Sequence, residues 1–150
     1  LVRRLPAWSA NVGKRLVKSP RLYVRDSGLL HALLGIDDKE SLLSHPVVGA
    51  SWEGFAIEHV ISVFETRDAY FWATHAGAEL DLMVLTAGKR YGFEFKYADA
   101  PGISRSMRIA IDDLSLDRLW VVYPGRREYA LDERITVIPI DAIQGFVPLD

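Results

Sequence analysis

The sequence contains no cysteine among its 150 residues. Disulfide bonds, zinc–thiolate sites and thiol catalysis are therefore excluded. Any metal centre has to use carboxylates and histidines, a donor set that favours hard cations such as Mg²⁺. No apolar run approaches the roughly 18 residues that a membrane-spanning helix needs, and no basic, apolar and small-residue leader opens the chain. These absences predict a cytoplasmic protein with no membrane partner.

Two further signatures are missing. The chain has no G-x-x-x-x-G-K-[ST] phosphate loop, so this segment is not expected to bind ATP in that way. Its four histidines are scattered and share no metal-ligand spacing. The first residue is Leu1 rather than Met, as expected of a piece of a longer protein.

The composition is that of one globular domain, with 49% apolar and 25% charged residues and no internal repeat. A chain of this length buries about 70% of the surface that its unfolded form exposes. Disordered, collagenous and disulfide-knotted classes are excluded. Oligomeric state is not encoded in any pattern that the sequence offers.

The net charge of −2 hides a strong asymmetry. Residues 1–25 carry a charge of +7 without any acid, which leaves 11 bases against all 20 acids, a charge of −9, for residues 26–150. We expect residues 1–25 to be a basic linker or the end of an upstream segment, and residues 26–150 to be the domain. A basic arm indicates an anionic partner such as nucleic acid, or else the solvated flank of a linker. The bases of the arm are Arg3, Arg4, Lys14, Arg15, Lys18, Arg21 and Arg25.

Apolar periodicity predicts an alternation of helices and strands. Residues 1–20 lack a period and are expected to be loop; short helices follow from Asp26 or Ser27 to Gly35 and over Lys39–Ser44, and a longer helix over Ala50–Glu65. Strands are expected at Tyr70–His75, Ala78–Thr86, Lys89–Ala98, Arg118–Tyr123 and Ile135–Ile140, with a helix at Ser104–Leu116. This order predicts an α/β fold whose mixed sheet is flanked by helices.

The expected strand Lys89–Ala98 carries two charges on one face. Alternation places Glu94 and Lys96 opposite a row of aromatic residues, Tyr91, Phe93, Phe95 and Tyr97. In the preceding strand, Asp81 interrupts an alternation in which Leu80, Leu82 and Val84 share a face. The short Ala87-Gly88 turn makes the two strands antiparallel and brings Asp81 near Glu94. Adjacent carboxylates repel each other unless a cation or a proton joins them, so a divalent metal is one solution.

A third acid, Glu53, lies on the apolar side of the long predicted helix. The order is Glu53, then Asp81 after 27 intervening residues, then Glu94-Phe95-Lys96 after 12 more. This pattern resembles the PD-(D/E)XK nuclease superfamily, although Leu80 rather than proline precedes the aspartate. The sequence as a whole resembles domain of unknown function 4143, the C-terminal part of many prokaryotic AAA-type ATPases. The resemblance rests on Lys14-Arg-Leu-Val-Lys-Ser-Pro-Arg-Leu-Tyr23, Asp26-Ser-Gly-Leu-Leu30, Gly49 with Trp52-Glu53-Gly-Phe55, Phe71-Trp72, Gly77-Ala-Glu-Leu-Asp81 and Trp120-Val-Val-Tyr-Pro-Gly125.

The resemblance implies a restriction-endonuclease-like core and a nuclease site. By that resemblance, Glu53, Asp81 and Glu94 would hold Mg²⁺ or Mn²⁺, with the Phe95 carbonyl as a further ligand, and Lys96 would orient or deprotonate the attacking water. The substrate would be DNA or RNA, and the upstream ATPase module of the full-length protein would be a partner. Candidates for phosphate contacts are Lys14, Arg15, Lys18 and Arg105.

Two other interpretations stay open at the level of sequence. In one, the domain is a non-catalytic module that binds a protein partner or regulates its own upstream ATPase module, as its acidic body suggests. In the other, Glu94 and Lys96 form an ordinary ion pair on a half-exposed sheet, and Glu53 merely favours the start of its helix.

Overall fold

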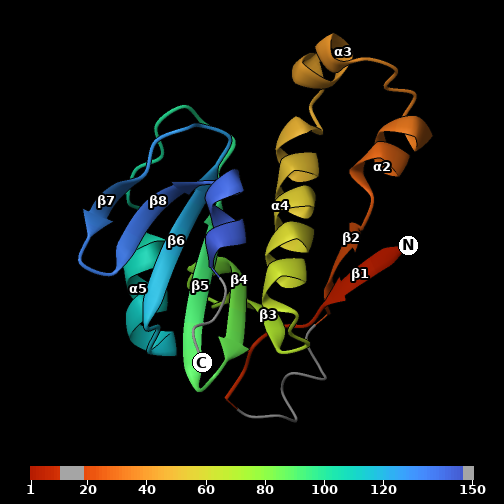
Figure 1. Cartoon of the computed structure of the whole chain (residues 1–150). Coiled ribbons are helices and arrows are strands. Elements are labelled where there is room, and N and C mark those ends of the chain that lie inside the picture. The colour runs from red at the N-terminus through yellow and green to blue at the C-terminus, as the bar shows by residue number, and fades with distance from the viewer. Residues whose placement is uncertain (11–18, 147–150) are drawn as a thin grey trace.

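The computed structural model describes residues 1–10 and 19–146 (Figure 1). A two-stranded ribbon and three helices precede a six-stranded sheet, which one crossover helix and a final 3₁₀ turn accompany. In chain order the elements are β1 (Val2–Leu5), β2 (Arg21–Val24), α2 (Ser27–Leu33), α3 (Lys39–Ser44), α4 (Val48–Phe64), β3 (Ala69–Ala73), β4 (Glu79–Thr86), β5 (Lys89–Phe95), α5 (Arg105–Leu114), β6 (Arg118–Tyr123), β7 (Tyr129–Asp132), β8 (Ile135–Pro139) and η1 (Ile140–Gly145).

The large sheet has the strand order β3-β4-β5-β6-β8-β7. Strands β3, β4 and β5 form an antiparallel meander, whereas β6 runs parallel to β5 and to β8. Helix α5 makes the crossover between the parallel strands β5 and β6, as a parallel connection requires. The predicted α/β class with a mixed, helix-flanked sheet is confirmed.

Two apolar layers hold the sheet between helices. The layer on one face joins α4 and η1 to the sheet, and the layer on the other face joins α5 to it (Figure 1). The alternation predicted for β5 is confirmed, because Phe93 and Phe95 pack in the α4 layer while Gly92 faces α5. A Cβ on Gly92 would lie 2.6 Å from Leu116 Cδ1, so a larger residue here would require the buried Leu116 side chain to shift.

Local signals explain where several elements begin and turn. Asp26 accepts a hydrogen bond from the Leu29 amide at 2.9 Å and caps α2, and Asp38 caps α3 in the same way. The turn between β4 and β5 has Ala87 and Gly88 at its centre, with φ values of +47° and +72°. Two positive φ angles are the requirement of the tight hairpin turns that match the twist of the sheet, so the predicted turn is confirmed.

The prediction of loop over residues 1–20 is wrong at its start. Val2–Leu5 forms β1, which pairs antiparallel with β2, and an isolated bridge joins Ala7 to Phe71 of β3. We call β1 and β2 together the N-terminal ribbon. The pairing links segments separated by about sixteen residues in which no hairpin signal stands, so local periodicity does not reveal it. Lys14, Arg15 and Lys18, named as candidates for phosphate contacts, lie outside the described residues.

Two further differences concern the sheet. Strand β7 was not predicted; it is a short edge strand that pairs only with β8. The face assignment of β4 was also wrong, because Leu80 packs in the α5 layer whereas Leu82 and Val84 pack in the α4 layer. No helix in the described part of the chain is long and apolar enough to cross a membrane.

Candidate functional site

A β-bulge in β4 sets the direction of the Asp81 side chain. Strand β4 pairs Met83 with Tyr70 and Leu80 with Trp72, so two residues of β4, Asp81 and Leu82, lie opposite one residue of β3. A bulge of this kind re-aims a side chain and is often found beside functional sites. The Asp81 side chain is buried, and its Oδ2 accepts a hydrogen bond of 3.0 Å from the Phe95 amide of the neighbouring strand.

Glu94 is the most deeply buried acid of the group, with 3% of the residue exposed. Its Oε2 lies 3.1 Å from Nζ of Lys96, which follows the end of β5. Burial raises the pKa of Glu94 to about 8, and the negative charge of Asp81 adds to this effect, while Lys96 opposes it. Glu94 therefore lies in a place where its negative charge is only partly compensated.

Lys96 is held at the site by the two strands that flank it. Its backbone amide donates a 3.0 Å hydrogen bond to the carbonyl of Val122, which continues the parallel pairing of β5 with β6. Burial lowers the pKa of Lys96, but the charges of Glu94 and Asp81 outweigh burial, and the net shift is upward. The ammonium is therefore protonated in this arrangement and acts as a fixed positive charge and hydrogen-bond donor.

Glu53 comes from the second turn of α4 and faces the same region. The Tyr23 hydroxyl donates a 2.7 Å hydrogen bond to Glu53 Oε1. Burial raises the pKa of Glu53; the bond from Tyr23 opposes the shift, and the charge of Asp81 adds to it. The four residues named from sequence, Glu53, Asp81, Glu94 and Lys96, are thus brought together from one helix and two strands.

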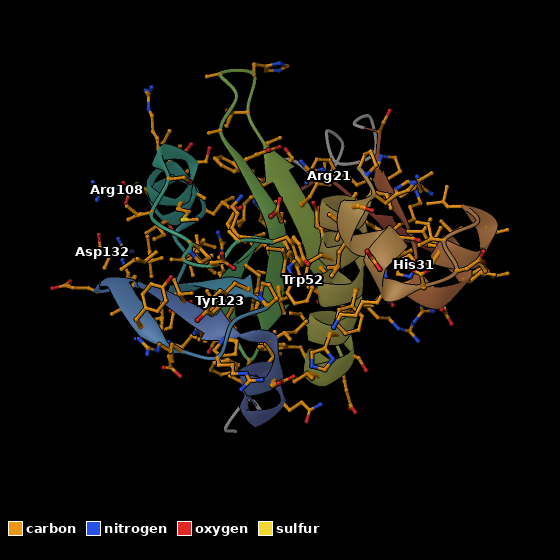
Figure 2. All side chains as sticks on the ribbon, turned by 90° about the horizontal axis from the view of Figure 1, so that it is seen from above. Arg21, His31, Trp52, Arg108, Tyr123 and Asp132 are labelled. Carbon is orange, nitrogen blue, oxygen red and sulfur yellow. The ribbon has the colours of Figure 1, made fainter. Side chains whose placement is uncertain are left out.

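Arg21 enters this group from the N-terminal ribbon. Its Nη1 lies 3.6 Å from Asp81 Oδ1 and 3.9 Å from Glu53 Oε1, and its Nη2 lies 2.7 Å from Glu79 Oε2. The guanidinium also stacks over the Phe71 ring, 4.7 Å from its centroid. Figure 2 shows Arg21 between the sheet and the ribbon, beside α4. We call Glu53, Asp81, Glu94, Lys96 and Arg21 the central cluster.

Sequence reasoning named Arg21 only as one charge of a basic arm and did not name Tyr23 as a site residue. A signal was present, because Arg21 and Tyr23 alternate with Leu22 and Val24 over four residues, as on the polar and apolar faces of a strand. The pattern does not say which acids that polar face meets. Only the pairing of β2 with β1 and the packing of the ribbon against α4 supply that answer.

Two other arginines of the arm, Arg3 and Arg25, are also paired within the chain. Arg3 donates to Glu58 of α4 through Nε and, at 2.9 Å, through Nη2, and Arg25 Nε donates to the same carboxylate at 2.9 Å. We call these three residues the Glu58 latch. The arginines lower the pKa of Glu58 although burial acts in the opposite direction. Arg3, Arg21 and Arg25 of the basic arm therefore meet acids of the same chain.

The donor set agrees in kind with a hard divalent cation, because three carboxylates converge, and burial together with the charge of Asp81 raises the pKa of Glu94. The arrangement of these carboxylates in space, however, does not match that of a metal site. Across residues 1–10 and 19–146, no three His, Asp or Glu side chains are arranged so that they hold a metal ion. Arg21 Nη1 lies within 4 Å of both Asp81 and Glu53, where a shared cation would bind. The donor types therefore suit such a cation, but the described side chains are not arranged to hold one, and Arg21 lies against two of the carboxylates.

The two remaining candidate residues, Phe95 and Arg105, have no confirmed functional role. The Phe95 ring packs in the α4 layer and its amide serves Asp81, while the role of its carbonyl as a ligand stays a prediction. Arg105 begins α5 and lines a separate cavity of about 230 Å³ with Thr74, Gly77 and Asp113. A larger cavity of about 360 Å³ lies beside Tyr23 and Glu53, between β2, α2 and α4.

Comparison with known proteins finds two families and two relatives. The profile of a domain of unknown function, DUF4143, matches residues 48–143, and that of a second, DUF8612, matches residues 1–40. An uncharacterised protein of Mycobacterium tuberculosis and one of Mycobacterium bovis are each 49% identical over 143 residues, which is 95% of this chain and 32% of the relative. The chain therefore spans about a third of the length of these relatives. No solved structure matches.

Proposed function

The chain belongs to the DUF4143 family, and we propose that its domain hydrolyses phosphodiester bonds in DNA or RNA with the help of Mg²⁺ or Mn²⁺. The fold would be a restriction-endonuclease-like variant of the mixed sheet, with its site at the bulge of β4. A single observation carries the proposal. Three carboxylates and one ammonium, from one helix and two adjacent strands, meet where the buried Glu94 has its pKa raised to about 8.

In this proposal Glu53, Asp81 and Glu94 would hold the cation, with the Phe95 carbonyl as a further oxygen donor. The bound cation would polarise the phosphate and stabilise negative charge on the leaving oxygen. Lys96 Nζ, 3.1 Å from Glu94, would donate a hydrogen bond to the attacking water and hold it in line with the phosphorus. The Phe95 amide keeps Asp81 in its orientation through the 3.0 Å bond that it already donates.

The test is cleavage of labelled single-stranded and double-stranded DNA and RNA by the purified chain in Mn²⁺. Lys96→Ala should reduce the rate by at least about a hundredfold, in line with the loss of a positioned proton donor. The matched control is Lys89→Ala, because Lys89 is an exposed lysine near the far end of β5, where it pairs with Asp117. Absence of cleavage on all substrates, or equal rates for Lys96→Ala and the wild type, would contradict the proposal.

A second function has its own support. In the central cluster, Arg21 already lies within 4 Å of two carboxylates that a cation would need, and residues 26–150 carry a charge of −9, which disfavours a polyanion. The alternative is a non-catalytic module that binds a protein partner or regulates an upstream ATPase module of the full-length protein. Cleavage in Mn²⁺ that Lys96→Ala abolishes would exclude it.

A further inference from the structure

The contacts of Arg21 differ from those of a purely structural ion pair. One nitrogen, Nη1, faces Asp81 and Glu53 at 3.6 and 3.9 Å, which are loose contacts, while Nη2 makes the tight 2.7 Å contact with Glu79. Glu79 is the outermost acid of the three, with 56% of its side chain exposed against 11% for Asp81. The guanidinium therefore has a firm outer partner and a weakly held inner position.

The backbone beneath Arg21 is fixed. Its strand partner in the ribbon is Leu5, which is 1% exposed, and Ala7, also 1% exposed, continues into the bridge with Phe71 of β3. The other end of the ribbon is open, since Val2 is 58% exposed. A change at the site therefore requires a rotation of the Arg21 side chain and not a release of the whole ribbon. About a quarter of that side chain, 28%, already faces solvent.

We propose that Arg21 is a resident counter-cation that competes with the divalent metal for Asp81 and Glu53, and that it sets the metal affinity of the site. This inference rests on the proposed function, because it assumes that the carboxylates bind a metal. When the metal arrives, Arg21 leaves the inner position and keeps its bond to Glu79. The site is then closed to cations that bind too weakly to displace the guanidinium.

Electrostatics gives the direction of the effect. Two positive groups cannot share the same pair of carboxylates at short range without strong repulsion, since their interaction inside a protein is only partly screened. Removal of the guanidinium should therefore strengthen metal binding. An arginine that merely anchors the ribbon, away from these carboxylates, would not change metal affinity in this direction.

The experiment is a calorimetric titration of the chain with Mn²⁺ alone. Arg21→Ala should bind Mn²⁺ at least about tenfold more tightly than the wild type, whereas Arg21→Lys, which keeps a positive charge, should stay closer to the wild type. The matched control is Arg25→Ala, because Arg25 directly follows β2 and pairs with Glu58 rather than with an acid of the central cluster, and its affinity should stay within about twofold of the wild type. Thermal unfolding of each variant without metal verifies that it is folded.

A second readout follows the arginine itself. In nuclear magnetic resonance spectra, the Nε–H signal of Arg21 should shift when Mg²⁺ is added, while that of Arg3 in the Glu58 latch should not. Equal Mn²⁺ affinities of the wild type and Arg21→Ala, or weaker binding by the variant, would overturn the inference and leave the metal site standing. Absence of Mn²⁺ binding by the wild type and by Arg21→Ala would overturn the metal site proposed above, and the inference with it.

Discussion

The Glu58 latch and the central cluster each take one acid from α4 and at least one arginine from the N-terminal ribbon, yet their charges are balanced in opposite ways. In the latch, one acid meets two arginines, and the pKa of Glu58 is lowered. In the central cluster, three acids share one arginine and one lysine, and the pKa values of Glu53 and Glu94 are raised. Only four residues of α4 lie between Glu53 and Glu58.

The ion pairs of the latch stabilise the fold, whereas the central cluster contains carboxylates that can still bind a ligand. A carboxylate with more cations than it needs gains nothing from an added ligand. A buried group of carboxylates with too few cations binds a proton or a metal instead. The distinction depends on how deeply each carboxylate is buried and on how many cations contact it.

The largest expected effect concerns Glu94, which should make the free energy of unfolding depend on pH. This effect would sharpen the contrast between the central cluster and the latch. Its pKa rises from 4.5 in the unfolded chain to about 8 in the folded one, so the folded state binds more protons between these values. Its contribution is fully present below pH 4.5 and is lost as pH rises towards 8. The slope can reach about 1.4 kcal/mol per pH unit.

Glu94→Gln should remove this decline, because the amide does not titrate. Urea unfolding of the metal-free protein at pH 5 and pH 8 measures the difference, and other titrating groups cancel when the variant and the wild type are compared. Asp117→Asn is a control at an exposed acid on the far side of the hairpin. Parallel pH profiles of wild type and Glu94→Gln would show that the central cluster is balanced like the latch.

The second effect concerns the latch itself. Glu58→Ala leaves Arg3 and Arg25 without their shared partner and removes the bonds that tie the ribbon to α4. We expect a loss of about 2 kcal/mol in the free energy of unfolding, since charge-assisted bonds to a half-buried acid are lost. Glu53→Gln, its neighbour on the same helix, should lose less, because its burial already disfavours the charge. An equal loss for both variants would break the comparison.

A third effect is stabilisation by metal. At a Mn²⁺ concentration tenfold above the dissociation constant, the wild type should gain about 1.4 kcal/mol of stability. Asp81→Asn should gain none, because the proposal makes the Asp81 carboxylate a ligand of the metal. Glu58→Gln should respond like the wild type, since its acid belongs to the latch. Thermal unfolding with and without Mn²⁺ is sufficient, and a gain that survives Asp81→Asn would place the metal elsewhere.

The smallest effect is on the acid side of the stability curve. The pKa of Glu58 is lowered below 4.5, so its contribution is present above pH 4.5 and is lost as pH falls through its folded value. Because this acid is partly exposed, we expect under about 1 kcal/mol. Glu58→Gln should flatten the decline below pH 4.5, and unfolding measured between pH 3 and pH 5 tests it. An unchanged acid limb would mean that the latch is already screened by solvent.

Sequence patterns predicted the elements whose signals are local. The alternation in β5 gave the faces of Phe93 and Glu94 correctly, and the Ala87-Gly88 turn placed β4 beside β5. Together these two signals predicted that Asp81 and Glu94 lie on adjacent strands. The prediction succeeded because a tight turn fixes the register of the two strands it joins.

The parts that sequence missed depend on contacts between distant segments. The bulge at Asp81 arises from the pairing of β4 with β3, and a period of two cannot show an extra residue. The arrival of Arg21 depends on how the ribbon packs against α4 and β4. Charge counting found the basic arm and the acidic body but did not reveal that they neutralise each other.

The anchoring of the ribbon through Leu5 and Ala7 bears on how shortened versions of the protein behave. Trimming at residue 26, where the charge of the sequence changes sign, discards Tyr23 and every arginine that meets Glu53, Glu58 or Asp81. In such a shortened protein, the carboxylates of Glu53, Glu58 and Asp81 would lack these arginine partners. A metal affinity measured on the shortened protein would then be a property of the trimmed product rather than of the intact chain.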